Sequence, residues 1–92
     1  MSDELALRKQ MAQGAQAQAT LDNPAIAVAF ELLEAEYFKA WKESASTDSE
    51  ARERLWTAAT IVGIVRSHLQ QAVSDGKLAQ AEIDALNPAT PR

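Results

Sequence analysis

The chain has 92 residues, of which 47% are hydrophobic and 24% are charged, and it contains no cysteine. This length excludes a multidomain enzyme, and the lack of cysteine excludes a disulfide-stapled scaffold. The formal net charge of -4 argues against broad binding to a phosphate backbone, which needs a clustered basic face. Nineteen residues are alanine, whereas only three are glycine and three are proline. Because alanine loses no side-chain entropy in a helix, this composition predicts an all-α protein with a thin core.

A first helical segment is predicted over residues 1–22. Its few large apolar residues give way to a tract of alanine and glutamine, which favours helix but offers little surface to bury. We therefore expect this segment to be mobile or to dock on a neighbour. Arg8 and Lys9 form the only adjacent basic pair in the chain. They are the candidate contacts for nucleic acid, although no clustered basic field surrounds them.

A long helical hairpin is predicted over residues 24–75. Asn23 can cap a helix whose first position is Pro24, and apolar residues follow at spacings of three and four. After a short connection, Thr47 and Glu50 are expected to form a capping box at the start of the next helix. Because the connection is short, the two helices should lie antiparallel and side by side.

The short connection also predicts which residues of the hairpin face each other. It sets Tyr37 beside Trp56 and Phe30 beside Gly63, and we expect Phe30, Tyr37 and Trp41 to be core residues. A glycine inside a helix costs about 1 kcal/mol relative to alanine, so Gly63 suggests a close approach of another group. We therefore predict close packing at Phe30 and along a row of small residues, which comprises Ala59, Gly63 and Ser67.

The second hairpin helix is predicted to end at Asp75. Gly76 follows in a position where a left-handed residue often terminates a helix. A short helix over residues 77–86 and a flexible tail over 87–92 complete the chain. The predicted fold is all-α, with a long antiparallel helical hairpin, a shorter N-terminal helix and a short C-terminal helix, in a single domain.

The sequence shows no pattern of catalytic or metal-binding residues. The single histidine, His68, has no carboxylate three or four residues away, so neither a general base nor a metal ligand would have its partners. Neither a glycine-rich phosphate loop nor a serine nucleophile elbow occurs, and no apolar run approaches the ~18 residues of a membrane span. We predict that the protein is not an enzyme and has no catalytic site, metal site, cofactor, small-molecule substrate or membrane partner.

The charged residues of the hairpin are expected to form a solvated face. Arg52, Arg54 and Arg66 could touch phosphate, but acidic neighbours weaken their field. The apolar residues are more informative, because two paired helices cannot cover all of them. The first and last helices could cover the surplus, but we favour an interface with another molecule, since contiguous exposed apolar patches usually mark one. The candidate interface residues are Leu32, Phe38, Trp56, Ile61 and Ile64.

Several short motifs are spread over about three quarters of the chain. They are Leu21-Asp22-Asn23-Pro24 before an aromatic-bearing helix, Trp41 near its end, Arg52-Glu53 within the stretch from Asp48 to Leu55, His68-Leu69, and Gly76-Lys77-Leu78-Ala79. On these residues, the stretch from Gly14 to Ile83 resembles a group of small helical proteins of tailed bacteriophages and prophages. Their genes are often carried among head-assembly and DNA-packaging genes, and the group has no assigned activity. The resemblance therefore implies a setting, the host bacterial cytoplasm or the virion, rather than a mechanism.

In this setting the first hypothesis is a non-enzymatic virion or assembly component. Its hairpin would self-associate or dock on a head, portal or connector protein by burying its second apolar face. The second hypothesis is a small terminase-like DNA-packaging subunit, although the segment before Asn23 is too poor in basic and core residues for the expected helix-turn-helix. The third is an inhibitor of a host protein. The expected partner is a further copy of the chain or a phage structural protein, and DNA is less favoured.

Overall fold

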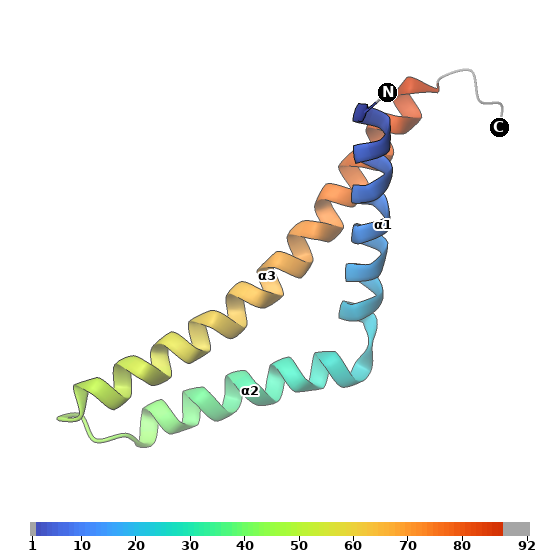
Figure 1. The fold of residues 1–92 in the computed structure, drawn as a ribbon. Coiled ribbons are helices and arrows are strands. Elements are labelled where there is room, and N and C mark those ends of the chain that lie inside the picture. The colour runs from blue at the N-terminus through green and yellow to red at the C-terminus, as the bar shows by residue number, and fades with distance from the viewer. Residues whose placement is uncertain (1, 88–92) are drawn as a thin grey trace. The chain divides into compact units, whose positions relative to one another are not determined.

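The computed structural model of the chain describes residues 2–87, and its elements are the helices α1 (Ser2–Asp22), α2 (Pro24–Glu43) and α3 (Ser49–Leu86) (Figure 1). No strand occurs in this described range, and the predicted all-α class is confirmed. Contacts within the chain divide it into two units. Unit 1 holds α1 as far as Leu21 together with the part of α3 from His68 onward, and unit 2 comprises Asp22–Ser67.

Local sequence signals explain where α2 begins and ends. The extended backbone of Asn23 lets its Oδ1 accept a hydrogen bond from the N–H of Ala25 at 2.9 Å. Pro24 occupies the first helical position, where no N–H is needed. The predicted N-cap is therefore confirmed. At the other end, Ser44 leaves the helical conformation, and its N–H donates to the carbonyl oxygen of Trp41 at 3.3 Å.

Asp48 caps the start of α3. Its Oδ1 accepts a hydrogen bond from the N–H of Ala51 at 3.1 Å, and its carbonyl oxygen accepts one from the N–H of Arg52 at 3.1 Å. The predicted capping box is wrong, because Thr47 lies one residue before this cap. The carboxylate of an aspartate is well suited to the position, since it also meets the positive end of the helix dipole.

Helix α3 runs unbroken through its 38 residues, a length of about 57 Å at 1.5 Å per residue. The predicted end at Asp75 and the separate helix over 77–86 are wrong, because Gly76 has no positive φ and stays within α3. The helix ends before Asn87, whose Nδ2 donates to the carbonyl oxygen of Ile83 at 3.0 Å. Apart from Asn87, the tail predicted over 87–92 lies outside the described residues.

Unit 1 is held together by a close crossing of α1 and α3 at two glycines. A Cβ atom added to Gly14 would lie 2.9 Å from both the carbonyl oxygen of Ala72 and the Cα of Gly76. A Cβ atom added to Gly76 would lie 3.0 Å from the Cα of Gly14 and 3.1 Å from the carbonyl oxygen of Gln10. Only residues without Cβ permit this contact. Gly76 therefore serves the close approach of a second backbone rather than the end of a helix.

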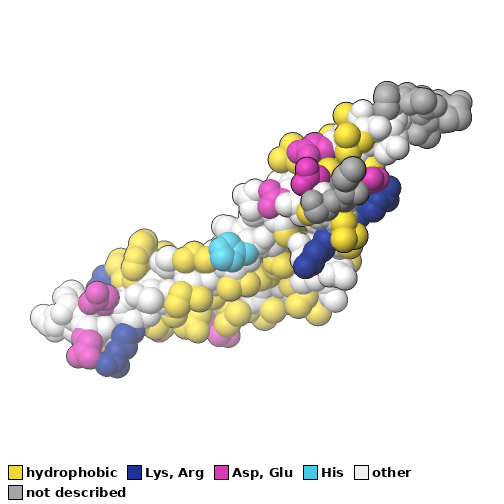
Figure 2. Space-filling model, turned by 45° about the horizontal axis from the view of Figure 1, so that its top comes forward, with side chains coloured by type: hydrophobic (Ala, Val, Ile, Leu, Met, Phe, Trp, Pro, Cys, Tyr) yellow, Lys and Arg dark blue, Asp and Glu magenta, His cyan; other side chains and the backbone are white. Residues whose placement is uncertain are grey.

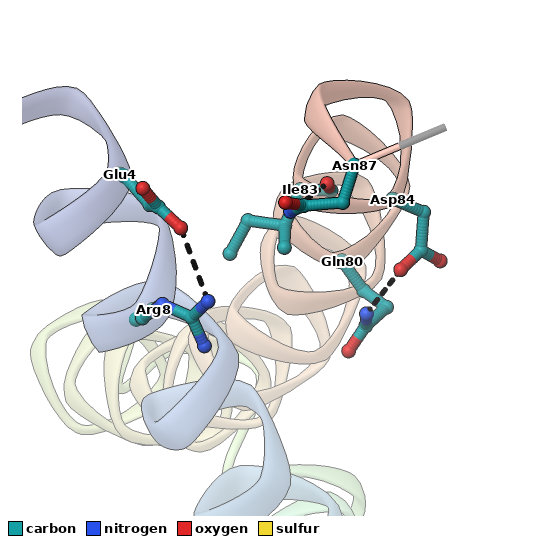
Figure 3. A network of polar contacts seen from close by, with 6 residues as sticks. All are labelled: Glu4, Arg8, Gln80, Ile83, Asp84 and Asn87. Atoms are coloured by element: carbon teal, nitrogen blue, oxygen red, sulfur yellow. Dashed lines mark hydrogen bonds and ion pairs between the residues drawn. The ribbon is translucent and has the colours of Figure 1, made fainter. Parts of the chain in front are cut away.

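The buried apolar side chains of the described range all lie in unit 1. They are Ala17 on α1 and Ala79 and Ile83 on α3, and the side chain of Ile83 points toward α1 (Figure 3). The segment over 1–22 was predicted to be mobile or docked on a neighbour. The structure describes Ser2–Asp22 as a helix whose Gly14 contacts α3 of the same chain.

Unit 2 brings α2 together with the first half of α3 and buries little. No residue of α2 is fully buried, and the same holds for the whole of Asp22–Ser67. The unit nevertheless contains most of the large apolar and aromatic side chains of the chain. Much of its apolar surface is therefore exposed.

The row of small residues on α3 is not closely packed. A Cβ atom at Gly63 would meet no atom within 4 Å, so the close approach predicted at Gly63 does not occur within the chain. Phe30 does not fill a notch there, and its ring lies instead under the guanidinium group of Arg66. Ser67 is exposed, while Ala59 lines a groove between the helices. The close packing predicted for this helix occurs at Gly76, at the crossing with α1.

Candidate functional site

An apolar groove lies between α2 and α3 in unit 2, and we call it the aromatic groove. The groove has a volume of about 230 Å³. Hydrophobic side chains gather on the surface of the molecule (Figure 2). Phe38 and Trp56 are its most open residues, with exposed fractions of 60% and 66%. The lining residues are Tyr37, Phe38 and Trp41 of α2 and Leu55, Trp56 and Ala59 of α3.

Helical spacing explains why these side chains meet. Tyr37 and Trp41 are four residues apart on α2, and Leu55 and Ala59 are four apart on α3. Residues at this spacing share one face of a helix. Tyr37 and Trp56 both line the groove, and their direct pairing across an antiparallel hairpin stays a prediction. Two amphipathic helices that meet along part of their apolar faces leave the remaining rings at the edge of the contact.

Arg52 of α3 binds to the last turn of α2 beside the aromatic groove. Its Nη1 donates to the carbonyl oxygens of Trp41 and Ser44 at 3.2 and 3.3 Å and to the Oγ of Ser44 at 3.1 Å. Its Cζ lies 4.1 Å from the centroid of the Trp41 ring, a cation–π contact. Its charge also meets the negative end of the α2 dipole. The prediction that Arg52 belongs to a solvated face is therefore wrong.

Replacing Arg52 with lysine should lower the free energy of unfolding by about 1–2 kcal/mol. A lysine ammonium group cannot both stack flat on the Trp41 ring and donate all the hydrogen bonds that the guanidinium group of Arg52 donates to Trp41 and Ser44. Arg54→Lys is the matched control, because Arg54 is 77% exposed and pairs with Glu50 on the surface, where an ion pair contributes only about 0.3–0.5 kcal/mol. Urea unfolding measures both variants. Equal losses in the two would contradict the role assigned to Arg52.

A second arginine joins α3 to α2 farther from the connection. Arg66 Nη1 lies 2.9 Å from Glu34 Oε1, and the Arg66 Cζ lies 5.0 Å from the centroid of the Phe30 ring. Arg66 and Arg52 therefore each pair with an aromatic ring of α2. Composition could not reveal these contacts. The predicted pairing of the helices could have revealed the first one, since it sets Arg52 opposite Trp41.

The five predicted interface residues do not lie in one groove. Phe38 and Trp56 meet in the aromatic groove, whereas the other three do not line it. Leu32, Ile61 and Ile64 are nevertheless exposed, and their part in an interface stays a prediction.

The basic pair of α1 lies in unit 1. The Nη2 of Arg8 lies 3.1 Å from the Oε1 of Glu4, one turn earlier on the same helix (Figure 3). Lys9 is exposed. Because a carboxylate offsets the charge of Arg8, the pair presents only a weak field to phosphate.

The described part of the chain offers neither a metal site nor a membrane-spanning helix. Within residues 2–87, no group of three or more His, Cys, Asp or Glu side chains could hold a metal ion, and His68 is exposed. None of the helices described is long and apolar enough to cross a membrane. In comparisons with known proteins, the chain matches no family model, no curated protein and no solved structure.

Proposed function

We propose that this protein is a non-enzymatic, protein-binding component in which unit 2 acts as a helical hairpin and presents the aromatic groove to another protein. The observation that carries the proposal is the exposure of Phe38 and Trp56, at 60% and 66%, in a unit without a fully buried residue. Aromatic side chains are enriched in the buried centres of protein interfaces and dominate their binding energy. A groove of this kind is suited to receive an apolar side chain of a partner.

The energetics of unit 2 support the same function. An isolated helix is marginal in water, and most of its stability in a protein comes from packing of its apolar face. Helix α2 has 20 residues, none of which is fully buried. A partner that covered the groove would supply the missing burial, and a fully buried Phe side chain contributes about 1.5–3 kcal/mol relative to an exposed one. Binding and stability of unit 2 should therefore be coupled.

We place this binding activity in the assembly of a tailed bacteriophage, in the host cytoplasm or the virion. The resemblance of the stretch from Gly14 to Ile83 to small helical phage proteins supports this setting. A second copy of the chain, or a head, portal or connector protein, would then cover the groove. Binding of this kind acts through contact alone and requires no catalytic residue.

Site-specific photo-crosslinking tests the proposed function. A photoreactive phenylalanine analogue at Phe38 should form a covalent product during infection by a phage that encodes the chain, because the groove is covered in the assembly. Mass spectrometry should identify in that product a second copy or a phage structural protein. The same analogue at Val28, which is 50% exposed on α2 and outside the groove, is the control. No product from Phe38, or the same products from both positions, would contradict the proposal.

A further inference from the structure

We propose that a second copy of this chain occupies the aromatic groove, and that Lys42 of each copy pairs with Glu53 of the other. This inference rests on the proposed function, because it names the partner of the same groove. It follows from the charges along the two rims of the groove and from the symmetry that a contact between identical surfaces requires.

The two rims of the aromatic groove carry opposite charges. Lys42 follows Phe38 by one turn of α2, and its Nζ lies 5.8 Å from the centroid of the Phe38 ring. Glu53 is exposed and precedes Trp56 by three residues of α3, a spacing that sets both on one side of the helix. In the described range, neither Lys42 nor Glu53 forms an ion pair within its own chain. The groove is thus apolar, with Lys42 on the α2 rim and Glu53 on the α3 rim, and neither forms an ion pair within the described chain.

Two groups of other charges near the connection between α2 and α3 are engaged, whereas Glu43 at the end of α2 forms no ion pair in the described range. Arg52 is bound to the end of α2, and Arg54 pairs with Glu50 at 2.6 Å. Lys42 and Glu53 both lie nearer to this connection than the exposed rings do, since one follows Phe38 and the other precedes Trp56. Lys42 and Glu53 are therefore at a similar level along the helices, on opposite rims.

A two-fold axis parallel to the helices brings these rims together. In a symmetric dimer, each residue that contacts a second residue of the other copy is itself contacted in return. With both copies pointing the same way, α2 of each copy faces α3 of the other. Phe38 then meets Trp56 of the second copy, and Lys42 meets Glu53 of the second copy. Each contact forms twice, which pairs the most exposed rings and joins Lys42 to Glu53 in both directions.

Reversing one copy would lose this complementarity. In that arrangement α2 of one copy lies antiparallel to α2 of the other. If the two Phe38 rings meet at the centre of the contact, Lys42 of one copy lies level with Glu34 of the second copy. Glu34 is already held by Arg66 at 2.9 Å, and Glu53 is left without a cation. Because like or unpaired charges disfavour an interface, the charges select the arrangement in which the copies point the same way.

Charge reversal tests this arrangement in the full-length chain. Lys42→Glu and Glu53→Lys should each weaken dimerisation by about tenfold or more, because each change creates two like-charge contacts per dimer. The double variant should recover the affinity of the wild type. Lys39→Glu is the matched control, since Lys39 lies one turn before Lys42 on α2 and makes no recorded contact with the Phe38 ring. Sedimentation equilibrium gives the dissociation constant of each protein, and circular dichroism checks that each is folded.

The outcomes separate the inference from the proposed function. Two weakened single variants and a recovered double variant would support the pairing. If the wild type dimerises and the single reversals leave the dissociation constant unchanged, the pairing is overturned. The pairing is also overturned if the double variant does not recover the affinity of the wild type. A chain that stays monomeric would overturn the second copy as occupant. In either case, a photo-crosslink from Phe38 to a phage structural protein would leave the proposed function standing, whereas the absence of any crosslink would contradict the proposed function as well.

Discussion

Gly14→Ala and Gly76→Ala are each expected to lower the free energy of unfolding by up to about 2 kcal/mol, although alanine is the better helix former. The new methyl group would lie 2.9 Å from the Cα of Gly76 in the first variant and 3.0 Å from the Cα of Gly14 in the second. These neighbours are backbone atoms, so α1 and α3 would have to move apart. Overpacking of this kind costs about 1–3 kcal/mol, against a gain in helix propensity of about 1 kcal/mol.

Gly63→Ala provides the matched control for this prediction. Gly63 lies in α3 like Gly76, but a Cβ atom there meets nothing within 4 Å. The free energy of unfolding should therefore rise by about 0.5–1 kcal/mol. Urea unfolding followed by circular dichroism measures all three variants. A rise in all three would show that α1 does not cross α3 at the glycines, and a fall in Gly63→Ala would restore the close approach predicted there from the sequence.

The parts of the fold that the sequence predicts are those encoded by neighbouring residues. Asn23 and Pro24 mark the start of α2 because a cap and a missing N–H act within one turn. The abundance of alanine predicts the all-α class for the same reason, since helix propensity is a property of each residue. Signals of this kind need no knowledge of what packs against the helix.

The role of each glycine in α3 could not be predicted because it depends on distant parts of the chain. A glycine that ends a helix and a glycine that admits a second backbone look alike in sequence. Gly76 is of the second kind only because Gly14, near the other end of the chain, packs against it. Gly63 has no such neighbour. The continuity of α3 through Gly76 follows from this tertiary contact.

The candidate site was predictable in part. Exposed Phe38 and Trp56 follow from helical spacing, because they lie beside the apolar stripes of α2 and α3. The groove itself depends on how closely the two helices approach, and the contacts of Arg52 with Trp41 and of Arg66 with Phe30 influence that approach. Such contacts between an arginine and a ring cannot be predicted from the positions of charged residues in the sequence. They explain why a face predicted to be solvated contributes to the shape of the groove.

Phe38→Asp is expected to weaken binding at the aromatic groove by at least about 30-fold, which corresponds to the 2 kcal/mol or more of an interface hot spot. The variant would place a charge in the apolar centre of the contact, where it loses water without gaining a partner. Because Phe38 is 60% exposed in the single chain, the helix content should stay the same. Val28→Asp is the control, with an exposed fraction of 50% on the same helix and a position outside the groove.

The dissociation constant for self-association of the wild type, Phe38→Asp and Val28→Asp, obtained by sedimentation equilibrium, tests most directly the claim that a second copy of the chain covers the aromatic groove. The account predicts that the wild type and Val28→Asp associate with similar affinity and that Phe38→Asp remains monomeric at the same concentrations with its helices intact. Association of Phe38→Asp with the affinity of the wild type, or equal weakening in both variants, would contradict it.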